Sequence, residues 1–321
     1  MKKWILVMLA AMGLPLAVWA FQADVIAPPI GDFPISVGGQ LSLGLLNGEA
    51  KEHVYDYETA DGSRRQLSRL DWDLDKVAMG GVNVSVRPIK HDLLDALTLN
   101  VGFWNALSEG SGEMDDYDWL DTGSSDWTHY SLSDVDVTEG YLLDVNVAWD
   151  LVEWKDLTGR AFVGYKQNGW TWEDQVQFGV YNGIYWDGQD ENLINYEQEF
   201  RMPYLGASVD WTKGDFTVAG RLSLSPFVGA DDWDHHFSGD RRYHESFEGG
   251  DMLGFGLDVR YAFSRGPLKG AFLAVAFDMQ TIDLIVGDME MWTPAGYSAS
   301  EDAAGIENNY TVLSLGGGYR F

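Results

Sequence analysis

Residues 313–321, the last nine of the chain, read "LSLGGGYRF". In an extended chain Leu313, Leu315, Tyr319 and Phe321 lie on one face, because successive side chains of a strand point to opposite faces. A terminal aromatic residue that closes such an amphipathic strand is the usual ending of bacterial outer-membrane β-barrels. This stretch therefore raises the hypothesis of a membrane barrel.

The same alternation recurs along the chain, for example in residues 141–149, 216–224, 253–263 and 273–280. A period of two indicates strands with one apolar face. A water-soluble β-sandwich alternates as well. Tyr and Trp, however, recur at the strand ends, as in the aromatic girdles of membrane barrels. A closed barrel also leaves no unpaired strand edge in lipid.

Turn signals divide the chain into ten segments and predict an all-β fold, a ten-stranded antiparallel transmembrane β-barrel. We expect short periplasmic turns and long extracellular loops. The short turns fall near 88–95, 152–159, 211–215 and 263–270; the long loops fall near 56–65, 108–134, 172–192, 229–250 and 288–305. Functional residues are expected in the long loops at the outer mouth.

The first twenty residues predict a secretory signal peptide. Lys2 and Lys3 precede an apolar stretch, and Val18 and Ala20 supply the small residues of a cleavage site. The alternative, a membrane anchor, is disfavoured because the stretch is short for a spanning helix. We expect residues 1–20 to be removed and residues 21–321 to form one barrel domain.

Composition excludes several classes of protein. The chain has no cysteine, which rules out disulfides, thiol nucleophiles and thiolate metal sites. Its 50 acidic and 21 basic residues give a net charge of −29, which repels nucleic acid and attracts cationic partners. Aromatic residues make up 14% of the chain, too many for a disordered acidic protein.

The motif "DDWDHHF" at 231–237 is the first candidate for chemistry. With a period of two, Asp232, Asp234 and His236 share one face. A carboxylate beside an imidazole orients the ring and raises its basicity, so Asp234 and His236 form a plausible base dyad.

The strand register under this motif contains a conflict. Leu222 and Leu224 have the same parity as Asp234, yet the alternation places both leucines on the lipid face. Either the strand bulges around residues 226–229, or it rises clear of the membrane.

The motif "MDDYDWLD" at 114–121 is the second candidate. Asp116 and Asp118 share a face, and paired carboxylates can position a water and share a proton. If this segment faces Asp234 and His236 across the mouth, a water between them would make a general-base hydrolase without a protein nucleophile.

Other interpretations remain open on the residues alone. Acidic extracellular loops are usually solvated faces, and that interpretation is the commonest for such residues. Clustered Asp suits Ca²⁺, but the spacing lacks the glycine and terminal glutamate of a calcium loop. Zinc would need several His or Cys ligands, and only His236 is well placed. We therefore predict no metal and no cofactor.

Several long motifs resemble the omptin family, aspartate- and histidine-dependent outer-membrane endopeptidases of Gram-negative bacteria. They occur in the family's order and cover nearly the whole mature chain: "SLGLLNGEAKEHVY", "QLSRLDWDL", "GEMDDYDWLD", "FRMPYLG", "DWDHH" and "AGIENNYTVLSLGGGYRF". The resemblance implies a ten-stranded barrel. It also implies that His236 takes a proton from water, that Asp234 orients His236, and that Asp116 and Asp118 hold the water and stabilise the intermediate.

The resemblance implies cleavage beside Arg or Lys, so cationic peptides or basic protein segments are the expected substrates. By motif, Glu52 and Asp232 would bind the cationic side chain, with Met114 and Ile194 as apolar lining. Two buried carboxylates would supply the partner that a desolvated cation requires.

The chain departs from the family at three positions. His129 follows a Trp-Thr pair where the family often has an acidic residue, so the preference after the cut stays open. Gly169 and Glu199 stand where basic residues would grip lipopolysaccharide, and only Arg201 remains nearby. Outer-membrane lipid is an expected partner, while the contact with lipopolysaccharide and the oligomeric state stay open. The rival functions are a non-catalytic adhesin, small pore or cation-binding surface barrel, and a metallohydrolase.

Overall fold

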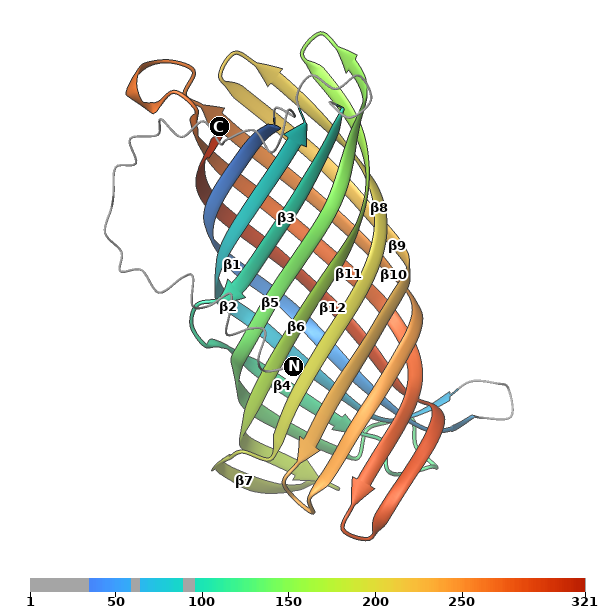
Figure 1. Ribbon diagram of the computed structural model, residues 1–321. Helices are drawn as coiled ribbons and strands as arrows, with labels where there is room; N and C mark the ends of the chain where they lie inside the picture. The colour runs from blue at the N-terminus through green and yellow to red at the C-terminus, as the bar shows by residue number, and fades with distance from the viewer. Residues whose placement is uncertain (1–34, 59–63, 89–95, 321) are drawn as a thin grey trace.

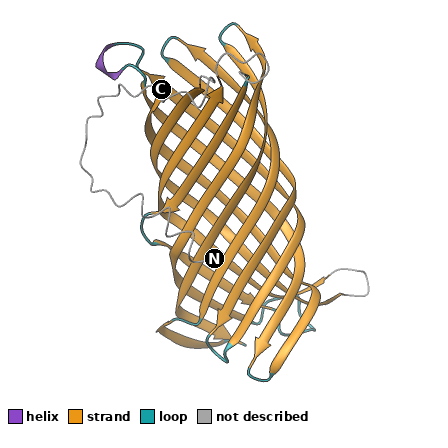
Figure 2. Ribbon diagram, viewed as in Figure 1, coloured by secondary structure: helices purple, strands orange, loops and turns teal. Residues whose placement is uncertain are grey.

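The computed structural model describes residues 35–58, 64–88 and 96–320, nearly all of them in strands (Figure 2). The predicted signal peptide lies outside the described residues. The strands are β1 (Ile35–Glu58), β2 (Arg64–Pro88), β3 (Leu97–Ala106), β4 (Gly110–Asp118), β5 (His129–Trp154), β6 (Leu157–Tyr181), β7 (Ile184–Glu191), β8 (Ile194–Lys213), β9 (Phe216–His236), β10 (Arg241–Ala262), β11 (Ala271–Thr293) and β12 (Gly296–Arg320). One 3₁₀ helix, η1 (Gly266–Leu268), lies between β10 and β11. Among the described residues no helix is long and apolar enough to cross a membrane.

The strands form one closed antiparallel barrel (Figure 1). β3 and β4 pair with successive parts of both β2 and β5, so together they fill one position in the ring. β7 pairs with the far end of β6, and β8 pairs with the rest of β6. Twelve strands therefore fill ten positions, which confirms the predicted fold. The carboxyl-terminal strand β12 pairs with β1, with Leu315 opposite Leu43, and so closes the ring.

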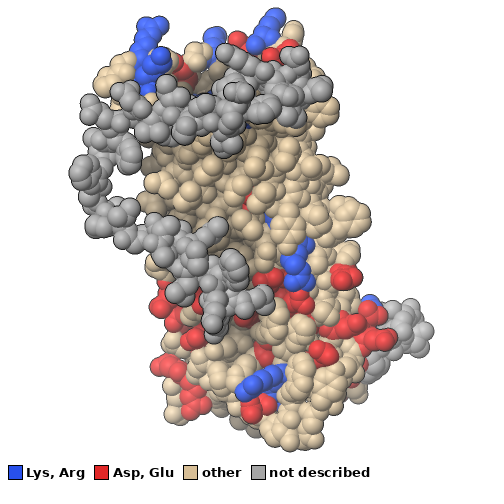
Figure 3. All heavy atoms as spheres, in the orientation of Figure 1, with Lys and Arg blue, Asp and Glu red and all other residues tan. Residues whose placement is uncertain are grey.

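An apolar band surrounds the barrel. On β1 the outward side chains of Leu41, Leu43 and Leu45 are 68%, 65% and 51% exposed. Exposure of so many apolar side chains is favourable only where lipid surrounds them. Figure 3 shows a middle zone almost free of charged side chains. Acidic side chains gather on the side of this zone where β4 and β7 lie in Figure 1.

The predicted short turns agree with the structure, and the predicted long loops mostly do not. Residues 155–156, 214–215 and 263–270 connect strands at one end, whereas the turn near 88–95 lies largely outside the described residues. The segments 172–192, 229–250 and 288–305, predicted as loops, are mainly strand. They continue because their inward side chains still pack in the interior. The hairpin tips at 119–128, 182–183, 192–193, 237–240 and 294–295 form the other end, here called the mouth.

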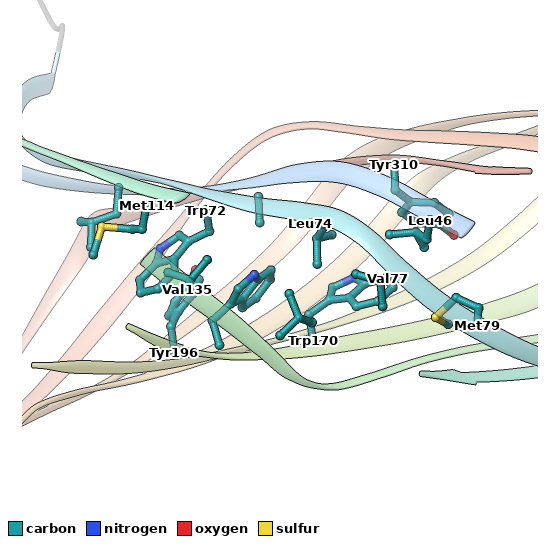
Figure 4. Packing of buried hydrophobic residues seen from close by; sticks show 14 of the residues in the cluster. Leu46, Trp72, Leu74, Val77, Met79, Met114, Val135, Trp170, Tyr196 and Tyr310 are labelled. Carbon is teal, nitrogen blue, oxygen red and sulfur yellow. The ribbon is translucent and has the colours of Figure 1, made fainter. Parts of the chain in front are cut away.

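The barrel interior is filled near the mouth. A hydrophobic cluster includes Trp72, Met114, Trp170, Trp172 and Tyr196, all nearly inaccessible to solvent (Figure 4). The rings of Trp72 and Tyr196 stack with centroids 5.1 Å apart. A polar cavity of about 500 Å³ occupies the lumen on the other side of this packing, lined in part by Lys166, Arg221 and Asp278.

Candidate active site

A β-bulge in β9 decides which way its acidic residues face. Ser225 and Val228 are both buried inside the barrel, and the two residues between them, Pro226 and Phe227, are both exposed. The pairing registers of β9 with β8 and with β10 shift at this point. The bulge reverses the alternation, so that Leu224 faces outward and residues beyond the bulge with even numbers face inward. The first of the two explanations offered for the register conflict is confirmed.

Asp234 and His236 therefore meet on the inner face of β9. The Nε2 atom of His236 lies 2.5 Å from Oδ2 of Asp234. Asp234 is 3% exposed, whereas about a quarter of the His236 side chain reaches solvent. Tyr243 on β10 presents its ring edge-on to the imidazole at 5.3 Å. The imidazole is thus held by a buried carboxylate and still open to the mouth.

The pKa of His236 reflects two opposing influences. These groups lie beyond the apolar band, because the outward positions of β9 after Phe227 include the polar residues Asp231 and His235. Burial alone lowers the pKa of His236, but the negative charge and hydrogen bond of Asp234 outweigh burial and raise it above the ordinary 6.5.

Asp116 and Asp118 lie on β4, between β2 and β5. The hydroxyl groups of Ser68 and Ser131 donate to Asp116 across 3.4 Å on either side. Burial and the charge of Asp118 raise the pKa of Asp116 to about 7, while His236 pulls it down. Asp116 and His236 are close enough for the charge of each to shift the pKa of the other, and both lie at the mouth end of the interior.

Glu52 and Asp232 lie buried beside this site, 3% and 0% exposed. Tyr196 donates its hydroxyl hydrogen to Oδ2 of Asp232 over 2.9 Å, and Gln198 donates to the Tyr196 oxygen over 2.8 Å. Burial is the main cause that raises the pKa of Glu52 far above its usual range, and the charges of Asp234, Asp232 and Asp116 add to it. Glu52 and Asp232 thus belong to the same electrostatic cluster as the dyad.

Met114 and Ile194 both pack in the hydrophobic cluster next to these carboxylates. Ile194 lies directly opposite His236 in the β8–β9 register. All eight residues predicted from the sequence therefore lie at the mouth end of the interior.

Asp174 on β6 was missed by the sequence reasoning. Its buried carboxylate accepts backbone hydrogen bonds from Leu193 and Ile194, each 2.7 Å, and a hydroxyl bond of 3.0 Å from Ser133. These bonds hold the start of β8, where Ile194 approaches His236. In the sequence, the sign that Asp174 faces inward is that it is two residues from Trp172 and therefore shares its face of the strand.

Glu245 on β10 was missed as well. It lies directly opposite Asp232 in the β9–β10 register and is 1% exposed. Both of its carboxylate oxygens lack a hydrogen-bond partner among the described residues. In the sequence, the only sign that Glu245 faces inward is that it is two residues from the apolar Phe247 and therefore shares its face of the strand.

The three residues that depart from the family pattern have defined contacts in the structure. His129 lies opposite Asp118 in the β4–β5 register and contacts the ring of Tyr181 at 4.7 Å. Glu199 accepts a hydrogen bond of 3.0 Å from the Tyr141 hydroxyl.

Gly169 lies opposite Tyr141 and beneath its ring. Arg201 pairs with two carboxylates, those of Glu199 and Asp231, so its charge is already compensated. Within the described ranges, no group of three or more His, Asp or Glu side chains is arranged to hold a metal ion.

Fold and site together define an outer-membrane β-barrel with an acidic cluster and one imidazole enclosed at its outer mouth. The sequence model of the omptin family matches residues 34–321. The chain belongs to the omptin family. It is an outer-membrane protease of that family.

Named relatives agree with this assignment. The chain is 32% identical to the plasminogen activator of Yersinia pestis over 293 residues, which cover 87% of this chain and 88% of that protein. It is 24% identical to protease 7 of Escherichia coli (strain K12), over 96% of each chain. The crystal structure of the outer membrane protease OmpT from Escherichia coli is similar in fold. The TM-score is 0.80 at 22% identity, covering 89% of this chain and 97% of that one.

Proposed function

We propose that this protein is an endopeptidase that cleaves peptides and proteins next to Arg or Lys, through a water activated by Asp234 and His236 opposite Asp116 and Asp118. The observation that carries the proposal is the buried Asp234 bound to His236 on the inner face of β9, facing Asp116. A carboxylate–imidazole pair beside a second carboxylate pair supplies a base, an acid and a place for water.

The hydrogen bond between His236 and Asp234 supports one assignment of the protons in this mechanism. Because Nε2 of His236 bonds Asp234, Nδ1 is the ring nitrogen that remains to act as the base. The imidazole takes one proton as the water oxygen bonds to the peptide carbonyl carbon. Asp234 stabilises the imidazolium. When the carbon–nitrogen bond breaks, the imidazolium returns that proton to the leaving amine.

Asp116 and Asp118 have a complementary role. Because the pKa of Asp116 is about 7, the pair retains a proton near neutral pH. A protonated Asp116 can donate a hydrogen bond to the oxyanion that forms on the carbonyl oxygen, while ionised Asp118 accepts one from the attacking water. The pair thus assists both the attacking water and the carbonyl oxygen when water adds to the peptide.

Glu52 and Asp232 supply the selectivity for a cation. Both are buried, and Oε2 of Glu52 and Oδ1 of Asp232 have no hydrogen-bond partner among the described residues. Unpaired buried carboxylate oxygens are costly, and a positively charged side chain would relieve that cost. Met114 and Ile194 would cover the apolar part of the same side chain.

The test uses the full mature chain refolded in detergent with a fluorogenic peptide that contains one Arg. Wild type is expected to cleave it, and His236→Ala to reduce kcat below detection. His235→Ala is the matched control, because its ring lies on the other face of β9 and contacts Asp240. A chelator is expected to have little effect. Equal cleavage by wild type and His236→Ala would refute the dyad, and loss of activity with chelator would favour a metallohydrolase.

A further inference from the structure

Glu245 is a buried carboxylate that the proposed chemistry does not use. It is 1% exposed, and neither of its oxygens has a hydrogen-bond partner among the described residues. Buried polar groups in folded proteins are nearly always hydrogen-bonded, and one that is not usually has a functional reason. A carboxylate buried in this way needs a cation, a proton or both.

The surroundings of Glu245 are known from each neighbouring strand. Asp232 lies opposite it on β9, and Met289 lies opposite it on β11. Glu52 on β1 and Asp234 on β9 are the other charges that act most strongly on it, and all of them are negative. The charge of Glu245 also raises the pKa of the hydroxyls of Tyr196 on β8 and Tyr243 on β10.

We infer that Glu245 is a third specificity-determining carboxylate of the pocket formed by Glu52 and Asp232, and that this pocket selects arginine over lysine. The inference rests on the proposed function for the identity of the pocket. It adds a residue and a choice between two cations.

The choice of cation follows from the unpaired acceptors. Four buried oxygens in the pocket have no partner among the described residues: Oε2 of Glu52, Oδ1 of Asp232, and Oε1 and Oε2 of Glu245. A guanidinium presents five N–H donors in a fixed plane, whereas an ammonium presents three on one atom. A set of four acceptors on three strands matches the wider group.

Asp232 and Glu245 also interact in the empty pocket. A hydrogen bond between Asp232 and Glu245 forms only when one of them carries a proton, whereas the four oxygens counted above are unpaired when both carboxyl groups are ionised. Burial raises the pKa of both carboxyl groups, and the interaction between them raises the pKa of Glu245 further while it lowers that of Asp232. An entering guanidinium favours the ionised form of both carboxyl groups. The KM for an arginine peptide therefore falls as pH rises.

The experiment compares two fluorogenic peptides that differ only in Arg or Lys at the cut, with wild type, Glu245→Gln and Glu248→Gln. Glu248 is the matched control, since it lies three residues along β10 and is exposed. Glu245→Gln is expected to raise KM for the Arg peptide about 10- to 100-fold, with kcat nearly unchanged. It should also bring the Arg-to-Lys ratio of kcat/KM close to that of a non-selective pocket and remove the fall of KM with pH.

Binding separates this inference from the proposed function. A labelled Arg peptide is titrated into His236→Ala and into the double variant His236→Ala with Glu245→Gln. Weaker binding by the double variant supports the pocket assignment even if the proposed hydrolysis fails. Equal binding, or an Arg-to-Lys ratio for Glu245→Gln equal to that of Glu248→Gln, overturns it. If Glu245→Gln does not fold, Glu245→Asp serves instead, and an unchanged ratio in that variant likewise overturns the inference.

Discussion

His236 and Asp234 are two residues apart on one strand, and their side chains meet on the inside of the barrel with Nε2 and Oδ2 2.5 Å apart. Because alternate residues of a strand share a face, this contact needs no loop and no partner strand to form. The imidazole is therefore positioned by rigid sheet. The bulge at Pro226 and Phe227 alone decides that it faces inward.

The pH dependence of activity should report His236. As a base it must be neutral, and its pKa is raised above 6.5 by the charge of Asp234 against the opposing effect of burial. We expect kcat/KM to rise with pH as His236 loses its proton, with a midpoint above pH 6.5, and to fall at higher pH as Asp116, whose pKa is about 7, loses the proton that it donates. Asp234→Asn should lower that midpoint and reduce kcat by about 10²- to 10⁴-fold, from a pH–rate profile. A midpoint that stays in place in Asp234→Asn would contradict the coupling.

The free energy of unfolding should change with pH in a way that depends on the protonation of Asp116. Burial and the charge of Asp118 raise the pKa of Asp116 from 3.8 to about 7, so the folded state holds a proton that the unfolded chain has lost. The barrel therefore loses stability as pH rises between these two values. Asp116→Asn should be more stable than wild type at pH 8, on the order of 1 kcal/mol, and about equal at pH 3.

Urea unfolding in detergent micelles measures this difference. Asp126→Asn is a suitable control, because Asp126 is an exposed residue on the hairpin tip that follows β4. A gain of stability that is the same at both pH values would show that the pKa of Asp116 does not differ between the folded and the unfolded chain.

Much of the fold follows from the sequence, because alternation identifies a strand and its two faces without knowledge of the partner strand. For this reason "LSLGGGYRF" identifies β12 as a barrel strand, whereas its pairing with β1 is known only from the structure. The loops were harder. The segment 229–250 is acidic, and only its inward residues, such as Phe247, show that it is a packed hairpin.

The candidate site divides in the same way. Asp234 and His236 are two residues apart on one strand, so the sequence alone predicts that their side chains share a face. Glu245 and Asp232 meet only across the β9–β10 register, which shifts between Phe247 and Met252. A register that depends on bulges in two strands cannot be read from either strand alone. Asp174 escaped notice because its partners are backbone N–H groups nineteen and twenty positions away in sequence.

The bulge itself can be tested by deletion of Phe227. Without the extra residue, either Leu224 turns inward or Asp232 and Asp234 turn outward. Lipid-facing contacts favour the second outcome. We expect a folded barrel, judged by heat-modifiable gel migration, with activity reduced at least about 100-fold. Phe227→Ala keeps the residue count and should retain activity within a few fold. A folded deletion variant that cleaves normally would show that the site tolerates either parity.

The substitution Tyr196→Phe removes a single oxygen atom, that of the hydroxyl group. Its hydroxyl donates to Asp232 over 2.9 Å, while its ring stacks on Trp72 at 5.1 Å. Tyr196→Phe keeps the stack and removes the donor, so the pKa of Asp232 should rise further and less of the carboxylate should be ionised. We expect KM for an Arg peptide to increase about 3- to 30-fold with kcat nearly constant, in steady-state kinetics. A fall in kcat alone would place Tyr196 with the reacting groups.

Ionic strength tests whether the acidic field of the protein contributes to substrate capture. The net charge of −29 and the acidic side chains around the mouth should steer cationic peptides toward the site. Salt shortens the range of this attraction, to about 10 Å at 0.1 M. We expect kcat/KM for a peptide with several Arg residues to fall about 10-fold or more between 10 and 300 mM NaCl. A peptide with one Arg and no net charge should change much less, since the buried pocket is poorly screened. Equal salt dependence for the two peptides would mean that only the pocket recognises the substrate.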